Sequence, residues 1–299
     1  MSRHHQLRGS VGYTEACASP DVREPWIGEI EAMRIVVTSD IHYSRQWKPV
    51  FTELARRIRA ESPDILLIAG DLGEPLKNFE LALALFDDFQ CPKGIVAGNH
   101  DVWRREGQYT SQQLWQEMLP GAARQHGYIW LEEENIVVGK TAICGTMGWY
   151  DYSGRDPALG FSPEEYENLK GLVNLDAQYI DWAYTDREFA NDLRLQFTGR
   201  LEDLESNPDI HQIIVVTHVP VFEECILRKP EDHHWNFGNA YFANLTLGRT
   251  IAPKRKVSLV VSGHSHVGGA WEINFGGNAL QAHIVDSDYG KPAYLSLDL

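Results

Sequence analysis

The sequence has few cysteines and no segment long and apolar enough to suggest a membrane span. Its 299 residues include four cysteines, which lie far apart and form no CxxC pair. This spacing argues against a zinc knuckle or a disulfide framework and is typical of buried thiols in a reducing compartment. No apolar run approaches the roughly 20 residues that cross a bilayer. We therefore expect no membrane partner.

Basic residues are also scarce, since 27 Lys and Arg stand against 42 Asp and Glu, for a net charge of −15. Nucleic acid and anionic membranes favour basic surfaces, so the charge argues against both as general partners. A phosphorylated substrate stays open, because bound cations can reverse the field locally. Residues 1–30 contain no apolar block of the signal-peptide kind, so we expect a cytoplasmic protein with a flexible extension over residues 1–32.

Apolar runs of strand length alternate with helical stretches in the first third of the chain. Strands are predicted over residues 33–39, 64–69 and 93–97, with helices over residues 49–60 and 79–89 between them. This alternation indicates βαβ units and a largely parallel sheet.

The rest of the chain predicts a second set of strands and no linker, so we expect one domain over residues 33–299. Two segments, residues 148–185 and 221–250, show little periodicity, and we expect them to cover one face and to set substrate specificity. The other predictions are a hairpin over residues 135–146, a helix over residues 186–205, and strands over residues 211–217, 256–262, 282–285 and 293–297 and around Trp271.

Polar residues of metal-binding type follow directly after five of the predicted strands. Ligands of open α/β sheets bind at the carboxyl ends of the strands, so we expect these residues to meet in one pocket. The clusters are Asp40-Ile41-His42, Gly70-Asp71, Gly98-Asn99-His100-Asp101, His218-Val219-Pro220 and Gly263-His264-Ser265-His266.

The spacing within these clusters favours shared metal ligation. In extended backbone, residues i and i+2 project to the same side, so Asp40 with His42, and His264 with His266, can aim donors at one point. Carboxylate, amide and imidazole donors without thiolate suit manganese, iron or zinc, with cobalt and nickel as further candidates. Each motif is weak alone, but all five in this order are not readily explained by chance.

The series D-x-H, G-D, G-N-H-D, H-x-P and G-H-x-H, from Asp40 to His266, resembles the calcineurin-like metallophosphoesterase superfamily. The resemblance implies an α/β fold, a four-layer α/β/β/α sandwich with two facing mixed β-sheets. It also implies two divalent metal ions that share Asp71 as a bridge. One ion would be held by Asp40, His42, Asp71 and His266, and the other by Asp71, Asn99, His218 and His264.

The sequence departs from the protein Ser/Thr phosphatase branch of that superfamily. The second motif of that branch continues through an Asp-Arg pair, whereas this chain has GDLGEPL, and Asp101 stands where the branch has glutamate. The small bacterial phosphodiesterase-type branch fits better. The resemblance makes His100 the catalytic histidine that faces the phosphate, and either Asp101 or Glu74 could orient its imidazole.

The expected activity is hydrolysis of a phosphodiester or phosphomonoester by a hydroxide that bridges two metal ions. A small nucleotide-like substrate is favoured, with Trp149, Tyr150 and His233-His234-Trp235 either stacking on it or packing their own loops. A nuclease acting on DNA or RNA ends is one alternative, although the net charge disfavours it. A non-catalytic metal-binding scaffold is another, but every motif residue is present.

Overall fold

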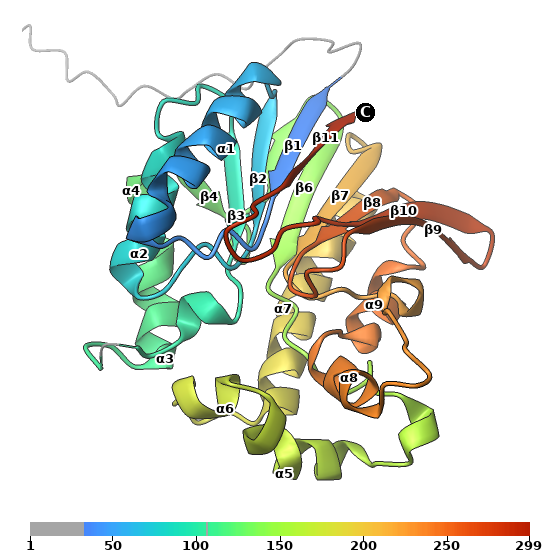
Figure 1. The fold of residues 1–299 in the computed structure, drawn as a ribbon. Coiled ribbons are helices and arrows are strands. Elements are labelled where there is room, and N and C mark those ends of the chain that lie inside the picture. The colour runs from blue at the N-terminus through green and yellow to red at the C-terminus, as the bar shows by residue number, and fades with distance from the viewer. Residues whose placement is uncertain (1–32, 106) are drawn as a thin grey trace, which may run out of the picture.

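The computed structural model describes residues 33–105 and 107–299, so the extension predicted over residues 1–32 lies outside the described residues. The described strands form two sheets (Figure 1). The first sheet contains, in spatial order, β11 (Tyr294–Asp298), β1 (Arg34–Thr38), β2 (Ile65–Ala69), β3 (Lys93–Val96) and β4 (Tyr128–Trp130). The second contains β5 (Ile136–Val138), β6 (Thr141–Thr146), β7 (Gln212–Thr217), β8 (Val257–Ser262), β10 (Asn278–Ile284) and β9 (Gly269–Phe275).

Both sheets are mixed, with a parallel centre and antiparallel edges. Strands β1 to β4 run parallel, and β11 pairs antiparallel with β1. Strands β6, β7, β8 and β10 run parallel, and β5 and β9 flank them in the antiparallel sense. The predicted βαβ units and the hairpin over residues 135–146 are confirmed.

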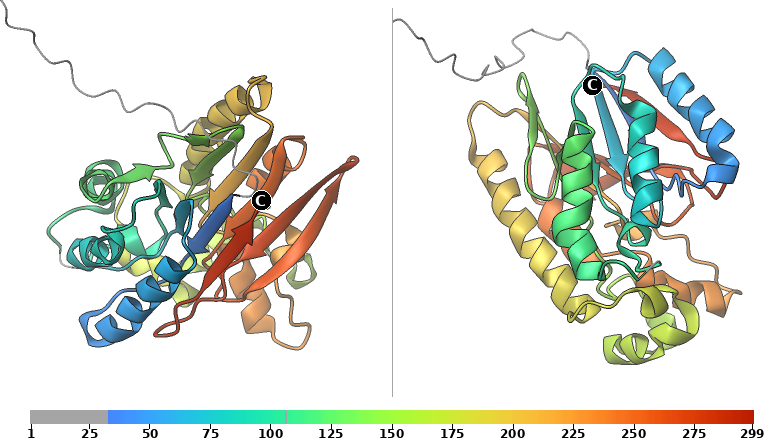
Figure 2. Two further views of the ribbon diagram at one scale, coloured as in Figure 1. Left: turned by 90° about the horizontal axis from the view of Figure 1, so that it is seen from above. Right: turned by 90° about the vertical axis from the view of Figure 1, so that its left-hand side faces the viewer.

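Helices cover the outer face of each sheet, which gives the predicted four-layer α/β/β/α sandwich (Figure 2). Helices α1 (Lys48–Ala60), α2 (Leu76–Leu83) and α4 (Leu119–Gln125) pack on the first sheet. Helices α7 (Asp186–Ser206) and α9 (Leu245–Ile251) pack on the second. The other helices are α3 (Ser111–Gln113), α5 (Pro163–Val173), α6 (Asp176–Tyr179) and α8 (His233–Gly238).

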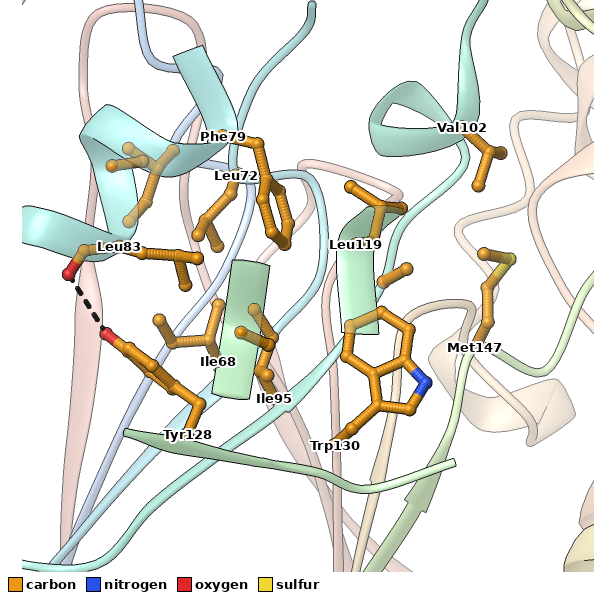
Figure 3. Packing of buried hydrophobic residues seen from close by; sticks show 14 of the residues in the cluster. Ile68, Leu72, Phe79, Leu83, Ile95, Val102, Leu119, Tyr128, Trp130 and Met147 are labelled. Carbon is orange, nitrogen blue, oxygen red and sulfur yellow. Dashed lines mark hydrogen bonds between the residues drawn. The ribbon is translucent and has the colours of Figure 1, made fainter. Parts of the chain in front are cut away.

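The strands of the first sheet divide their side chains between two cores, because successive strand residues point to opposite faces. In β1, Ile35 and Val37 face the other sheet, whereas Val36 faces the helices. Figure 3 shows the helix-side core, where Ile68 and Ile95 pack beneath Phe79 of α2. Every residue of β2 is buried, as expected for a strand with both faces covered.

Helix α1 forms where apolar residues recur at helical spacing. Phe51, Leu54, Ala55 and Ile58 are its buried residues, and they make one stripe along the helix. A proline in the first turn suits the start of a helix, because no intrahelical partner is lost there. Helix α7 begins with a capping box between Thr185 and Glu188.

Two parts of the first layer differ from the sequence prediction. The helix predicted over residues 79–89 starts earlier, after Pro75, and its α-helical part ends at Leu83, followed by a 3₁₀ turn over Ala84–Phe86. Helix α4 and strand β4 were not predicted. Strand β4 has three residues, too few for a period to show in the sequence.

The two segments of little periodicity gather at the carboxyl ends of the strands, as Figure 1 shows for α5, α6 and α8. In the described part of the chain, no helix combines the length and the apolar character required to traverse a lipid bilayer.

Candidate metal centre

The predicted site residues meet where the carboxyl ends of β1, β2 and β3 face those of β7 and β8. Backbone hydrogen bonds tie the neighbouring loops together. The Asp40 amide donates to the Gly70 carbonyl at 3.0 Å, and the His42 amide donates to the Asp71 carbonyl at 3.0 Å. In the other sheet, the Gly263 amide donates to the His218 carbonyl at 2.9 Å. The loops therefore hold one another in place.

One group of side chains converges beside β1. His42 Nε2 lies 3.3 Å from His266 Nε2 and 3.7 Å from Asp71 Oδ2. His266 Nε2 in turn lies 3.3 Å from Asp40 Oδ1. Ligand atoms of Asp40, His42 and His266 are close enough to share one ion.

A second group converges beside β7. His218 Nε2 lies 3.1 Å from His264 Nδ1, 3.0 Å from Asn99 Oδ1 and 3.5 Å from Asp71 Oδ2. The same Asp71 oxygen thus borders both groups. The structure brings together all seven residues predicted as ligands, in the two sets that the resemblance implied.

Hydrogen bonds to backbone carbonyls fix which imidazole nitrogen faces the centre of the second group. His218 Nδ1 lies 2.9 Å from the Ala69 carbonyl, and His264 Nε2 lies 3.0 Å from the Tyr241 carbonyl. A carbonyl oxygen only accepts, so these two nitrogens carry protons. The opposite nitrogens, His218 Nε2 and His264 Nδ1, point at each other. In metal-binding histidines, the nitrogen that does not face the metal typically donates a hydrogen bond to a carbonyl or carboxylate oxygen, as both histidines do here.

The Asp71 carboxylate is oriented in a similar way. Its Oδ1 accepts a hydrogen bond from the His100 amide at 2.9 Å, which leaves Oδ2 facing the imidazoles. Asp71 and Asp40 are both almost fully buried, and no Lys or Arg forms an ion pair with either among the described residues. Buried carboxylates of this kind require a positive partner.

The pKa values of the histidines reflect this demand for positive charge. Burial lowers the pKa of His218, but the Asp71 and Asp40 carboxylates and the Ala69 carbonyl together outweigh burial and raise that pKa to about 9. Burial and the His218 charge hold the pKa of His264 at about 4, and burial likewise holds the pKa of His42 at about 4. His42 and His264 are therefore neutral near pH 7, and a divalent ion would replace the His218 proton.

Backbone strain is concentrated at the same residues. Non-glycine residues rarely adopt positive φ, yet φ is 52° at Asp40, 43° at His42, 53° at Asp71, 67° at His264 and 54° at His266. The extended geometry expected for the two i, i+2 pairs is therefore wrong. Their donors converge because tight left-handed turns follow the strands, and strain of this kind is typical of functional sites.

Two glycines permit the close packing of these loops. A Cβ on Gly98 would collide with the Asp71 side chain, and a Cβ on Gly263 would collide with Ser39 and Asp40. Each glycine directly precedes one predicted ligand and makes room for another.

His100 lies next to the Asp71 group and stacks on Trp103, with the ring centroids 3.6 Å apart. Its Nδ1 lies 3.8 Å from Glu74 Oε2. Asp101 is placed differently, because its carboxylate accepts hydrogen bonds from the Gly73 and Gly98 amides at 3.0 and 2.8 Å. The geometry thus favours Glu74 over Asp101 as the partner of His100, and it gives Asp101 a role in holding two loops.

A cavity of about 310 Å³ opens onto these groups. Asp71, Asn99, His100, His264 and His266 line its floor. The other lining residues are largely apolar: Trp103, Val173, Asn174, Leu175, Trp235, Phe242, Ser265 and Tyr289. Five of them lie in the two segments expected to set specificity, but the sequence named only Trp235 as a possible substrate contact.

Trp149 and Tyr150 are fully buried, so they pack the protein interior and do not stack on a substrate. His233 and His234 do not line the cavity. Of the aromatic segment considered for substrate binding, Trp235 alone does so. Tyr289 also lines the cavity, although the sequence did not suggest it. Its ring stacks on His42, with the ring centroids 4.3 Å apart.

Comparison with protein families decides the classification. The family model of calcineurin-like phosphoesterases matches residues 33–268, which contain all seven predicted ligands. The chain belongs to the calcineurin-like phosphoesterase family. As a calcineurin-like phosphoesterase, it is a metal-dependent phosphoric ester hydrolase. The two groups of side chains around Asp71 are candidates for binding the divalent metals that the family uses.

Solved structures share this calcineurin-like fold at low sequence identity. The phosphopantetheinyl hydrolase PptH from Mycobacterium tuberculosis matches with a TM-score of 0.65 and 17% identity, over 86% of this chain and 89% of that chain. A dimetal phosphatase from Danio rerio matches with a TM-score of 0.51 and 13% identity, over 88% of this chain and 91% of that chain. The search of curated proteins gave no match.

Proposed function

We propose that the chain hydrolyses a small phosphodiester with two divalent ions, one held by Asp40, His42, Asp71 and His266 and the other by Asp71, Asn99, His218 and His264. The observation that carries this proposal is the position of Asp71 Oδ2, 3.7 Å from His42 Nε2 and 3.5 Å from His218 Nε2. When bound, such a pair of ions activates water near neutral pH and neutralises phosphoryl charge.

The residues of the chain supply the geometry and a proton. Asp71, Asn99, His264 and His266 line the cavity, and His100 lines it beside them, stacked on Trp103. We assign to His100 the stabilisation of charge on the phosphoryl group and proton donation to the leaving oxygen. Glu74, close to His100 Nδ1, would orient the ring so that Nε2 faces the substrate.

The lining of the cavity favours a diester over a monoester. Among the described residues that line it there is neither lysine nor arginine. Two ions carry about +4 and the two carboxylates −2, which matches one singly charged diester and a hydroxide better than a doubly charged monoester. Val173, Leu175 and Trp235 offer apolar contact to the other side of the diester. We therefore propose an apolar or aromatic leaving group, which includes nucleosides and extended thioalkyl arms.

Removal and return of metal tests the proposed activity. Protein stripped with EDTA is expected to be inactive, and manganese, iron or zinc is expected to restore hydrolysis of bis-p-nitrophenyl phosphate. The measured panel adds cyclic nucleotides, a phosphopantetheinyl diester, p-nitrophenyl phosphate and single-stranded DNA. We expect diesters to be turned over at least about tenfold faster than the monoester, since the site lacks the additional cation that a second phosphoryl charge requires.

The possible outcomes separate the competing functions. Restored activity confined to single-stranded DNA would support the nuclease alternative. Two tightly bound metals without turnover of any compound would support the non-catalytic scaffold and contradict the proposed function.

Leu175 offers a test of the apolar wall. It is 51% exposed and lines the cavity, so Leu175→Ser removes apolar contact with the substrate at little expense to the core. We expect KM for an aryl diester to rise about threefold to tenfold, because part of the burial free energy of one leucine side chain is lost from substrate binding. We expect kcat to stay nearly unchanged. Leu172→Ser is the matched control, because Leu172 is 80% exposed and does not line the cavity. Equal KM values in the two variants would refute the apolar wall.

A further inference from the structure

A buried carboxylate lies behind the second group of ligands. Asp176 begins α6 in the irregular segment 148–185 and is fully buried. Its Oδ1 accepts hydrogen bonds from Asn99 Nδ2 at 2.9 Å and from Trp103 Nε1 at 2.6 Å. Its Oδ2 accepts a hydrogen bond from the Tyr150 hydroxyl at 2.7 Å. No lysine or arginine pairs with it among the described residues, so these donors satisfy the carboxylate.

The hydrogen bond to Asn99 determines which end of that amide faces the other ligands. A carboxylate oxygen accepts only, so the Asn99 NH₂ group must point to Asp176. The amide oxygen then points the opposite way, 3.0 Å from His218 Nε2. Without Asp176 the amide could turn and present its NH₂ group, which cannot bind a cation, to the metal centre.

The same carboxylate oxygen also anchors the support of His100. Trp103 donates to Asp176 and stacks on the His100 ring. Asp176 follows directly after Leu175 and Asn174, which line the cavity. Asp176 therefore connects the predicted ligand Asn99, the Trp103 ring that stacks on His100, and the cavity-lining residue Leu175.

We propose that Asp176 is a positioning residue that holds Asn99 as an oxygen ligand and thereby sets the affinity of the second metal. The inference rests on the proposed two-metal function. It assigns a role in the metal centre to the segment 148–185, which the sequence predicts as a cover for one face and as a specificity element. Loss of an outer hydrogen-bond partner typically lowers metal affinity by about tenfold to a hundredfold.

The chain offers a matched control in Asp186. This second buried aspartate accepts a hydrogen bond from Trp149 Nε1 at 2.8 Å and another from the Tyr152 hydroxyl, and it pairs with Lys170. Like Asp176, it accepts from one indole and one tyrosine hydroxyl, but its third partner is Lys170 in place of the predicted ligand Asn99. If Asp176 only stabilised the fold, Asp176→Asn and Asp186→Asn would be expected to change metal affinity to a similar extent.

The experiment is a manganese titration of EDTA-stripped full-length chain, followed by calorimetry and by metal analysis after gel filtration. Wild type is expected to bind two ions. In Asp176→Ala, the affinity for the ion at the site that contains Asn99 is expected to fall by about tenfold to a hundredfold. The affinity for the other ion is expected to stay within about threefold of wild type. Asp176→Asn keeps an acceptor but loses the charge, so we expect a loss of about threefold to tenfold. Asp186→Asn is expected to lower the melting temperature of the metal-free chain and leave both affinities within about twofold.

The outcomes distinguish this inference from the proposed function. Fewer than two ions on wild type would contradict the two-metal function itself. With two ions on wild type, unchanged affinity in Asp176→Ala, or equal losses in Asp176→Asn and Asp186→Asn, would overturn the positioning role. If Asp176→Ala does not fold, the comparison of the two asparagine variants decides. Excess manganese is expected to restore most of the turnover lost in Asp176→Asn.

Discussion

Asp71→Asn is expected to lower both bound metal and turnover more than any other single change in the chain. The carboxylate oxygen between His42 and His218 becomes part of a neutral amide, so the two proposed metal sites would lose the negative ligand that they are proposed to share. Several kcal/mol of charge stabilisation would be lost, equivalent to about a thousandfold in kcat/KM. Metal analysis after gel filtration is expected to find fewer than two ions per chain.

Asp64→Asn is the control for this change, because Asp64 lies just before β2, at the end of the strand opposite to Asp71. Its Oδ2 accepts a hydrogen bond from the Arg34 amide at 2.8 Å, which an asparagine oxygen can also accept. We expect normal metal content and turnover. Two tightly held ions in Asp71→Asn would show that the two groups are not bridged by this residue.

His100→Ala is expected to leave both ions in place and to lower turnover in a way that depends on the leaving group. Proton donation by a positioned side chain contributes typically about 10²–10⁴-fold, and a poor leaving group needs the proton most. The loss should therefore be greatest for alkyl phosphodiesters and smaller for p-nitrophenyl esters. The measurement is kcat for both kinds of ester at saturating manganese, with bound metal determined in parallel.

Glu74→Gln provides a graded comparison, because the Glu74 carboxylate lies 3.8 Å from His100 Nδ1 and also pairs with Arg105 at 3.1 Å. A smaller loss than in His100→Ala is expected, with the same dependence on the leaving group. Unchanged hydrolysis of an alkyl diester by His100→Ala would eliminate the assigned role of this histidine.

The sequence predicted which polar residues the fold brings together better than it predicted their surroundings. Asp40, Asp71 and His218 follow apolar strands, and the end of a strand is visible in sequence as the point where a β-branched run stops. Strand order and the meeting of two sheets are not visible in this way. The pairing of β11 with β1 joins Asp298 to Arg34, far apart in the chain, through contacts that no local pattern encodes.

Residues that support the centre escaped prediction because their roles depend on tertiary contact. Asp176 lies in an irregular segment, and in sequence it resembles any helix-capping aspartate. Trp149 and Tyr150 were open to two interpretations, and only their burial decided for packing. The direction of donors at Asp40 and His42 was predicted, but for the wrong backbone, because positive φ at a non-glycine residue has no reliable sequence signal.

The left-handed backbone at positions 40, 42, 71, 264 and 266 also limits how this chain can evolve. Aspartate, asparagine and histidine tolerate that conformation better than most residues, and glycine adopts it without penalty. A β-branched replacement would lose a donor and add strain, whereas glycine would lose the donor and relieve strain. In a lineage freed from selection for catalysis, glycine and asparagine are therefore expected to appear first at these five positions, marking inactive descendants before their folds diverge.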